Sequence, residues 1–465
     1  MGAPRLSALD TSFLGVETPT AHMHIGWAAV FDPPEDGPRP GFDELCAHVE
    51  ARLFRARRCR QKLRRVPFEL NAPVWVDDPD FDLSNHVIRA ESRSLSRVVD
   101  TCMSQPLPRD RPLWQMWIAP RTDDGRMALV GKAHHCMVDG IAAVELGSLM
   151  LDPVPHPPAV EADAWQPAAA PGQVELLVRG VVDLVRDELR LASLPARIMS
   201  SPDRAREAVG RGARALGALA DSLRPARPVN PLNREISPRR HLAYLTRPIT
   251  ELLEIKRAQN VKLNDVVLSV ATSGVRRFLA ERGERPPCVK AMVPVSVRGE
   301  EEGDALGNRI SFMFIDLPCD EPDPVRRLHE IHGDTDEHKR RGRAEGGDDM
   351  LGLLGLAPPP IQRLFSRIAA SPRTFNLVVS NIPGPRGEAY MCGCRLWQAY
   401  PVVPLADRHT LSIGFTSVAD NGCFGLYADR DALPDVDDLA SCIDAAIDEL
   451  LELAGRAEPR APAFA

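Results

Sequence analysis

The sequence lacks any long hydrophobic run, and this absence limits how the protein can meet a membrane. No segment of the 465 residues contains 18 consecutive apolar residues, so none is expected to span a bilayer as a helix. The N-terminus also lacks the apolar stretch of a secretory signal peptide. We therefore expect a cytoplasmic protein whose membrane contact is at most peripheral, at the inner membrane or the surface of lipid droplets.

Patterned cysteines and excess positive charge are also missing. The ten cysteines are scattered, and Cys392 and Cys394 are their only close pair, so the sequence offers neither a disulfide framework nor the ligand spacing of a zinc site. This favours a reducing compartment. The formal net charge is −7, which argues against a general nucleic-acid binder, because phosphate recognition normally needs a basic excess.

Three common enzyme signatures do not occur. There is no Gly-x-Ser-x-Gly elbow of a serine hydrolase. There is also no phosphate-binding Gly-x-x-x-x-Gly-Lys loop, and no dinucleotide-binding glycine fingerprint follows a strand. The sequence therefore gives none of the usual evidence for these three large enzyme classes.

The chain is long enough for two domains of roughly 200 residues each and a connector. Residues 1–151 mix strand-like and helix-like segments. Residues 152–238 begin with a stretch rich in proline and alanine and continue as a helical, arginine-rich connector. Residues 239–465 alternate helices with strands. The predicted fold is α/β (α+β), with two sandwich domains of mixed sheets joined by the helical connector.

The apolar periodicity predicts the individual elements. The expected strands are 24–31, 114–120, 127–133, 241–247, 289–295, 309–317, 374–381 and 395–403, and the expected helices are 42–55, 141–151, 249–259, 264–282, 323–345, 349–369 and 435–454. A hairpin is expected over residues 412–427, with Asn421 and Gly422 in its turn.

The helical part of the connector, residues 173–223, allows two interpretations. Its apolar residues on one side are Leu177, Val181, Leu184, Val185 and Leu189. This stripe can pack on the helix's own domain. It can also lie on a lipid surface with arginines facing the headgroups, although acidic residues interrupt the basic face.

A His-His-x-x-x-Asp-Gly motif at residues 134–140 is the strongest indication of chemistry. It follows the strand expected at 127–133 and precedes a helix expected from Ile141, so it lies at a strand end, where sites often form. A neutral imidazole can take a proton from an alcohol near neutral pH, because its pKa lies close to that pH. Asp139 can shape the turn by pairing with an arginine or serve as the N-cap of the helix, and Gly140 permits a tight turn.

This motif resembles the active-site signature of the CoA-dependent acyltransferase superfamily, which includes chloramphenicol acetyltransferase and the condensation domains of peptide synthetases. Other segments are similar to the bacterial wax ester synthase/diacylglycerol acyltransferase family. They are Leu-Ser-Ala-Leu-Asp at 6–10, Arg-Pro-Leu-Trp at 111–114, Asn-Asp at 264–265, Pro-Val-Ser-Val-Arg at 294–298, Gly-Asn-Arg at 307–309 and Ser-Asn-Ile-Pro-Gly-Pro at 380–385. The similarity runs from Leu6 to about Leu451, apart from the connector.

The resemblance implies two chloramphenicol-acetyltransferase-like domains with the catalytic histidine in a channel between them. It implies that His135 is a general base and that the acceptor alkoxide attacks the thioester directly, without an acyl-enzyme, a metal or a bound cofactor. Acyl-CoA is then a co-substrate. His134 and Asp139 are expected to support His135, and Arg298 to pair with Asp139. The implied reaction moves a long-chain acyl group to diacylglycerol, giving triacylglycerol, or to a long-chain alcohol, giving a wax ester.

Four further residues are candidates for contact with substrate, namely Gly140, Trp114, Asn264 and Asn381. Trp114 can instead be part of the core, and Asn264 can be the N-cap of the helix that follows it. Asn381 precedes a rigid Pro-Gly-Pro turn that either faces the site or only connects strands. Asp265 is expected to give structural support.

Two other functions remain open. One is an acyltransferase of the same superfamily that uses a different hydroxyl acceptor. The other is a weakly catalytic or non-catalytic protein that coats a lipid surface through the connector. The intact motif with His135, Asp139 and Gly140 favours catalysis, because a scaffold has no need of it.

Overall fold

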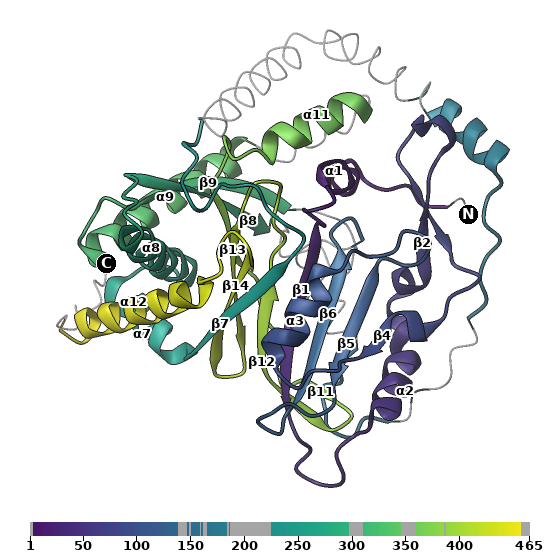
Figure 1. Ribbon diagram of the computed structural model, residues 1–465, viewed down its shortest axis with the longest axis horizontal. Coiled ribbons are helices and arrows are strands. Elements are labelled where there is room, and N and C mark those ends of the chain that lie inside the picture. The colour runs from purple at the N-terminus through teal and green to yellow at the C-terminus, as the bar shows by residue number, and fades with distance from the viewer. Residues whose placement is uncertain are drawn as a thin grey trace.

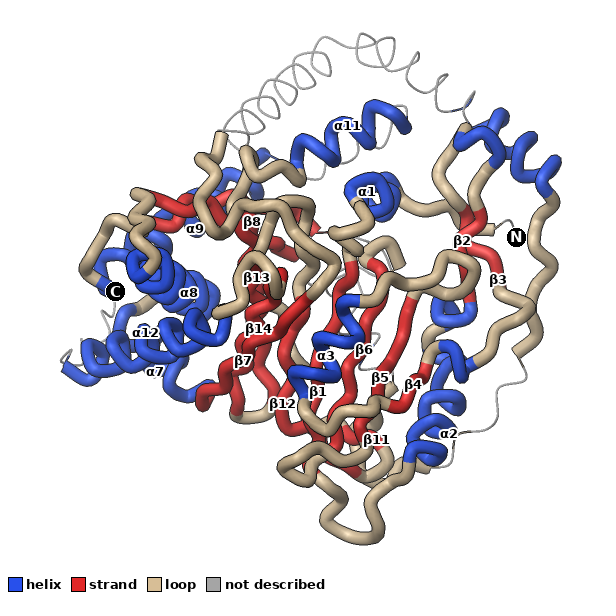
Figure 2. The backbone as a smooth tube through the Cα atoms, viewed as in Figure 1, coloured by secondary structure: helices blue, strands red, loops and turns tan. Residues whose placement is uncertain are grey.

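Two six-stranded sheets of mixed strand direction form the frame of the protein. The structure is a computed structural model that describes residues 3–137, 147, 150–158, 160, 165–183, 186, 225–296, 310–345, 359–385 and 387–456. The two sheets lie side by side, with helices on their outer faces (Figures 1 and 2). This architecture is the two-domain α/β fold that the sequence predicts.

The first sheet has the strand order β11-β12-β1-β6-β5-β4. Its strands are β1 (His24–Asp32), β4 (Val87–Arg89), β5 (Trp114–Ala119), β6 (Met127–His134), β11 (Tyr390–Met391) and β12 (Cys394–Val402). β4 runs parallel to β5, and the other pairs are antiparallel. Alternate side chains of β1 point to opposite faces. Ala28 and Val30 pack on α3 (Leu95–Ser104), and Ala29 and Phe31 pack in the same apolar cluster as α2 (Phe42–Arg52).

The second sheet has the strand order β7-β14-β13-β10-β8-β9. Its strands are β7 (Arg240–Pro248), β8 (Cys288–Ser296), β9 (Ile310–Pro318), β10 (Leu377–Asn381), β13 (Leu411–Val418) and β14 (Asn421–Asp429). The helices packed on it are α7 (Ile249–Gln259), α8 (Leu263–Glu281), α9 (Pro324–Glu345) and α12 (Val436–Arg456). β10 is parallel to both β8 and β13, so this sheet too is mixed, as predicted. The smaller β2 (Gln61–Arg64) and β3 (Val74–Asp77) pair separately.

The start of α8 differs from the prediction. Lys262 is the N-cap, and the side chain of Asp265 accepts a hydrogen bond from its backbone N–H at 3.0 Å. Asn264 therefore lies in the first helical turn, and its interpretation as the N-cap is wrong. Asp265 is fully buried and also accepts hydrogen bonds from Thr335 at 2.8 Å and from His332 at 2.7 Å, both on α9. Its carboxylate therefore joins α8 to α9.

The β13–β14 hairpin also differs from the prediction in its turn. Val418 pairs with Asn421, so Ala419 and Asp420 form the turn, and Asn421 already belongs to β14. The register places Phe415 opposite Phe424, and both rings are buried in the core of the second domain. A two-residue turn at Asn421-Gly422 would instead place Phe415 opposite Ala428 and separate the two rings. Contact between the aromatic pair, with 4.7 Å between the ring centroids, therefore favours the observed register over a turn at Asn-Gly.

Strand β12 connects the two domains. It comes from the C-terminal part of the chain, but it pairs with β1 in the first sheet and packs on β13 and β14 of the second. A Cβ atom at Gly425 would lie 2.2 Å from the carbonyl oxygen of Pro401 on β12, so this contact requires glycine. The predicted division into residues 1–151, 152–238 and 239–465 assigns β12 to the C-terminal domain, whereas this strand belongs to the first sheet.

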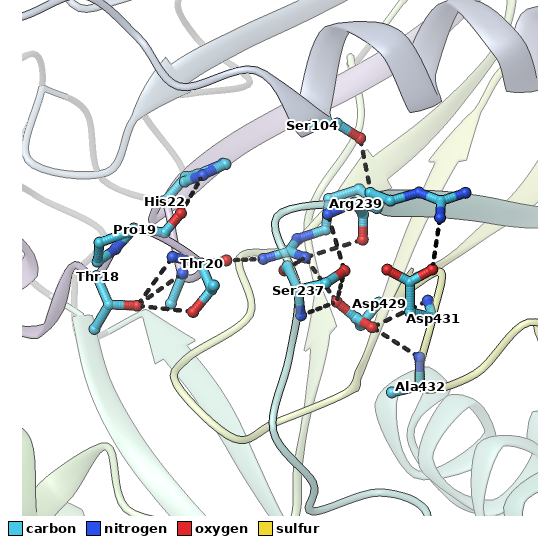
Figure 3. A network of polar contacts seen from close by, with 12 residues as sticks. Thr18, Pro19, Thr20, His22, Ser104, Ser237, Arg239, Asp429, Asp431 and Ala432 are labelled. Carbon is cyan, nitrogen blue, oxygen red and sulfur yellow. Dashed lines mark hydrogen bonds and ion pairs between the residues drawn. The ribbon is translucent and has the colours of Figure 1, made fainter.

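A buried ionic network fastens the start of β7 to the first domain (Figure 3). Arg240 and Asp429 are 2% and 0% exposed, and their side chains pair at 3.0 Å. Asp429 also accepts hydrogen bonds from the backbone N–H and hydroxyl of Ser237 at 2.8 and 3.0 Å. Arg240 donates its backbone N–H to the Ser104 hydroxyl at 2.9 Å and its guanidinium to the carbonyl of Thr20. The network thus fixes the loop that leads into β1.

Several predictions fall on residues that the structure does not describe. Most of the helix expected at 141–151 and of the connector helix lies outside the described residues. Within the connector, residues 173–183 form a helix, as expected. α11 (Pro359–Ala369) corresponds to the second half of the helix expected at 349–369. None of the helices in the described part combines the length and apolar character needed to cross a bilayer.

Candidate active site

The two histidines of the motif lie where β6 ends. His134 is the last residue of β6 and pairs with His24 on β1. The backbone N–H of His134 donates to the carbonyl of Leu113 at 2.9 Å, and that of His135 donates to the carbonyl of Met23, also at 2.9 Å. Leu113 belongs to the Arg-Pro-Leu-Trp segment, which therefore helps to place the motif. The backbone at both histidines is held from two sides.

His134 is fixed in a neutral form. Its side chain is 0% exposed, and its Nδ1 accepts a hydrogen bond from the backbone N–H of Cys136 at 3.1 Å. Burial lowers the pKa of His134 well below its ordinary value, and the positive charge of Arg109 adds to this effect. Because Nδ1 uses its lone pair for Cys136, the proton of the neutral ring is on Nε2. His134 therefore has no available nitrogen lone pair with which to take a proton from a substrate.

His135 is held by an aromatic contact instead. Its ring stacks on Phe13, with 3.7 Å between the ring centroids and 13° between the planes. Phe13 lies on α1 (Ala8–Val16), which begins at the N-cap Ser7, whose hydroxyl accepts from the N–H of Asp10 at 3.0 Å. His135 is only partly buried, unlike His134. Of the two imidazoles, it is the one that a substrate can reach.

Glu17, at the end of α1, adds a carboxylate to the site. Its Oε2 lies 3.8 Å from Nε2 of His134 and forms an ion pair with Arg109. Burial raises the pKa of Glu17, while Arg109 opposes that shift. Sequence reasoning missed Phe13 and Glu17. Ser7 followed by Asp10 is a helix-start pattern that predicts α1, but nothing in it shows that the helix packs on the motif.

Lys132 places a buried positive charge near the histidine motif. Lys132 is 1% exposed, and its Nζ donates to the carbonyls of Cys102 and Gln105 at 2.6 and 2.8 Å. These carbonyls lie at the C-terminal end of α3, where the helix dipole favours a cation. Burial lowers the pKa of His24 well below its ordinary value, and Lys132 lowers it further. The imidazole of His24, paired with His134 across the strands, is therefore also neutral.

An apolar cavity of about 70 Å³ lies between the sheets, beyond the motif. Its walls include Ile25, Trp27, Ala29 and Phe31 of β1, Leu396, Ala399 and Pro401 of β12, and Ile382, Gly384 and Pro385 of the turn after β10. Ile25 pairs with Ala133, two residues before His135, so the cavity begins close to the motif. A Cβ at Gly384 would lie 1.7 Å from the carbonyl oxygen of Ser417, so the turn can approach β13 only because this residue is glycine.

The other predicted site residues lie in different places. Trp114 is 2% exposed, donates its indole N–H to the carbonyl of Cys59 at 2.8 Å and stacks on His86. Trp114 is therefore part of the core, which is one of the two places that the sequence allowed. Asn381 ends β10, directly before the turn that lines the cavity. Asn264 lies in the first turn of α8. The three remaining candidates, Asp139, Gly140 and Arg298, lie outside the described residues.

The two mixed-sheet domains, with a histidine pair at a strand end, agree with the chloramphenicol-acetyltransferase-like fold expected from the sequence. Two solved structures share the fold. A wax ester synthase/diacylglycerol acyltransferase from Marinobacter aquaeolei VT8 matches with a TM-score of 0.68 and 24% identity, covering 97% of this chain and 100% of that one. The first condensation domain of the CDA synthetase matches with a TM-score of 0.59 and 17% identity, over 99% and 97% of the two chains.

Sequence comparison names the family. The model of the wax ester synthase/diacylglycerol acyltransferase catalytic domain matches residues 6–267, and that of the WS/DGAT C-terminal domain matches residues 306–451. A Mycobacterium tuberculosis protein described as "Probable diacyglycerol O-acyltransferase tgs1" is 31% identical over 466 residues, covering 97% of this chain and 96% of that protein. The chain belongs to the wax ester synthase/diacylglycerol acyltransferase family and is an acyltransferase. The resemblance noted in the sequence is thereby confirmed.

Proposed function

We propose that the protein transfers a long-chain acyl group from acyl-CoA to the hydroxyl of diacylglycerol or of a long-chain alcohol, forming triacylglycerol or wax ester. The observation that supports this most directly is the unequal state of the two histidines. His134 has its Nδ1 lone pair occupied by Cys136, whereas His135 is partly exposed and oriented by Phe13. This difference supports His135 as the imidazole that exchanges a proton with a substrate.

His135 then acts as a general base. It takes the proton of the acceptor hydroxyl while the oxygen attacks the thioester carbonyl. The tetrahedral intermediate collapses, the carbon–sulfur bond breaks, and the CoA thiolate leaves with the proton from His135. No acyl-enzyme forms. In this proposal Asp139 keeps the turn in shape by pairing with Arg298, and Gly140 and Asn381 lie beside the substrates.

The apolar cavity is proposed to hold the acyl chain. Its walls offer almost no polar partner, as expected for a site that receives hydrocarbon. We predict that Ala399→Leu, which adds atoms to the wall of the cavity, lowers kcat/KM for palmitoyl-CoA about tenfold relative to hexanoyl-CoA. Steady-state kinetics with both thioesters measures this ratio within each variant.

The matched control is Ala258→Leu, at an exposed position on α7, which should leave the ratio unchanged. If Ala399→Leu lowered the rates with both thioesters equally, the cavity would not be the site of the distal part of the chain.

The proposed reaction is tested by CoA release. Native protein is incubated with palmitoyl-CoA alone, with added dioleoylglycerol, or with added hexadecanol. Thiol release that requires an acceptor supports acyl transfer, and the better acceptor names the product. Equal release with and without acceptor would identify a thioester hydrolase instead.

A lipid surface as the source of substrate is supported by an exposed apolar face. The face consists of Phe68, Val174, Val178, Val181, Val182, Leu364 and Ile368, with exposures from 42% to 85%. Its three segments are connected: Val66 packs on Gly180 in the 173–183 helix, and Glu69 pairs with Arg363 of α11 at 2.8 Å. Figure 1 shows α11 and this helix along the same edge of the molecule. Exposed apolar faces of this extent mark interaction sites.

We predict that the double substitution Phe68→Ser and Leu364→Ser lowers binding of the full chain to phosphatidylcholine vesicles containing diacylglycerol severalfold. Co-sedimentation measures the bound fraction. Val154→Ser, at a valine that is 45% exposed away from this face, is the control and should bind like the native protein. If the native protein stays in the supernatant, the lipid-surface proposal is wrong. Binding without any acyl transfer would favour the non-catalytic alternative.

A further inference from the structure

A second hollow, more polar than the apolar cavity, opens beside the C-terminal end of α1. It encloses about 550 Å³, and its walls come from both domains. The residues that matter are Glu17, Thr18, Arg367, Arg373, Asp407 and Arg408. We call it the arginine cleft.

The arginines of this cleft have unused hydrogen-bonding capacity. Arg367, Arg373 and Arg408 are exposed. Within the described ranges, neither Arg373 nor Arg408 forms an ion pair, and Arg367 makes only a long contact of 3.4 Å to the carbonyl of Gly15. Of the two acidic residues in the walls, Glu17 is already paired with Arg109. The three guanidinium groups therefore outweigh the one remaining carboxylate, that of Asp407.

Two of the arginines are held on the same wall. His409, which follows Arg408, is 1% exposed and contacts the carbonyl of Phe375 at 3.1 Å. Phe375 lies two residues after Arg373, and its ring stacks on His409 with 4.2 Å between the centroids. The loop with Arg408 is thus attached to the segment with Arg373, so both guanidinium groups can reach one ligand.

The cleft adjoins the histidine motif. Glu17 is part of its wall and at the same time lies 3.8 Å from Nε2 of His134. Glu17 therefore links the wall of the cleft to the motif. A ligand anchored by the arginines can extend along α1 toward His135, which contacts Phe13 on the same helix.

We propose that the arginine cleft binds the phosphate groups of the CoA donor, an inference that rests on the proposed function. Of the proposed substrates, only the thioester bears phosphates, whereas diacylglycerol and long-chain alcohols are uncharged. Guanidinium groups bind phosphate oxygens through paired, charge-assisted hydrogen bonds. CoA then enters beside the C-terminal ends of α1 and α11, and the acceptor approaches His135 from another side.

Titration calorimetry with free CoA tests this without any need for catalysis. The double substitution Arg373→Ala and Arg408→Ala is expected to raise the Kd for CoA about tenfold or more, and salt is expected to weaken binding to the native protein. Arg257→Ala, at an exposed arginine on α7, is the charge-matched control. An unchanged Kd in the double variant would overturn the proposal.

Kinetics separate this proposal from the proposed function. The double variant is expected to have a raised KM for palmitoyl-CoA but a native KM for S-palmitoyl-N-acetylcysteamine, which has no phosphate. Equal losses with both thioesters would contradict a phosphate site. If CoA binding depends on the arginines but the protein transfers no acyl group, the phosphate site is supported and the proposed function is wrong. Loss of binding to phosphatidate vesicles with unchanged CoA affinity would assign the cleft to a lipid headgroup and overturn the proposal.

Discussion

Replacing His135 with alanine is expected to lower kcat for acyl transfer by about 10²- to 10⁴-fold, with little change in KM for palmitoyl-CoA. In the proposed mechanism the variant lacks the base that takes the proton of the acceptor, while the cavity and the arginine cleft do not depend on this imidazole. The measurement is acceptor-dependent thiol release, with circular dichroism to show that the fold is retained.

Two variants make the result specific. His156→Ala removes an exposed histidine and should leave kcat at the native value. His134→Asn keeps an oxygen that can accept from the N–H of Cys136, so a smaller loss is expected than with His135→Ala. If His134→Asn were as damaging as His135→Ala, or if His135→Ala kept native activity, the assignment of the general base to His135 would be wrong.

Replacing Asp429 with alanine is expected to lower the free energy of unfolding by about 3–5 kcal/mol, because it leaves the buried guanidinium of Arg240 without its counter-ion. The donors of Ser237 lose their acceptor as well. The shift in the midpoint of denaturant unfolding measures the effect.

A neighbouring ion pair supplies the control. Asp431 pairs with Arg239 at 2.9 Å, but the two side chains are 45% and 61% exposed (Figure 3). Asp431→Ala is expected to change the free energy of unfolding by less than about 1 kcal/mol. Replacing Arg240 and Asp429 together by Met and Leu should recover part of the loss, because no buried charge then lacks a partner. Equal effects of Asp429→Ala and Asp431→Ala would show that the buried network has no special role in joining the domains.

Much of the fold follows from local patterns in the sequence. Three strands agree with the predicted ranges to within a residue or two, namely His24–Asp32, Met127–His134 and Arg240–Pro248. A short run of alternating or continuous apolar residues has few possible structures other than a strand. The predicted place of the histidine motif, at the end of a strand, is confirmed for its first two residues.

What the sequence could not show depends on contacts between distant segments. Nothing local places β12 in the first sheet, since its partner strand β1 lies near the opposite end of the sequence. The stacking of Phe13 on His135 joins residues more than a hundred positions apart. The N-cap of α8 was misplaced at Asn264 because Asp265, a buried acceptor for several donors, determines where the helix begins.

Product analysis shows whether the protein moves acyl groups from CoA to a lipid hydroxyl and whether this transfer needs His135. Native protein and His135→Ala are incubated with palmitoyl-CoA and either dioleoylglycerol or hexadecanol, and the lipid products and free CoA are quantified by mass spectrometry. We expect triacylglycerol or palmityl ester in equal amount to CoA from the native protein, and a loss of both in the variant. CoA without either ester, or ester formed equally by His135→Ala, would contradict this expectation.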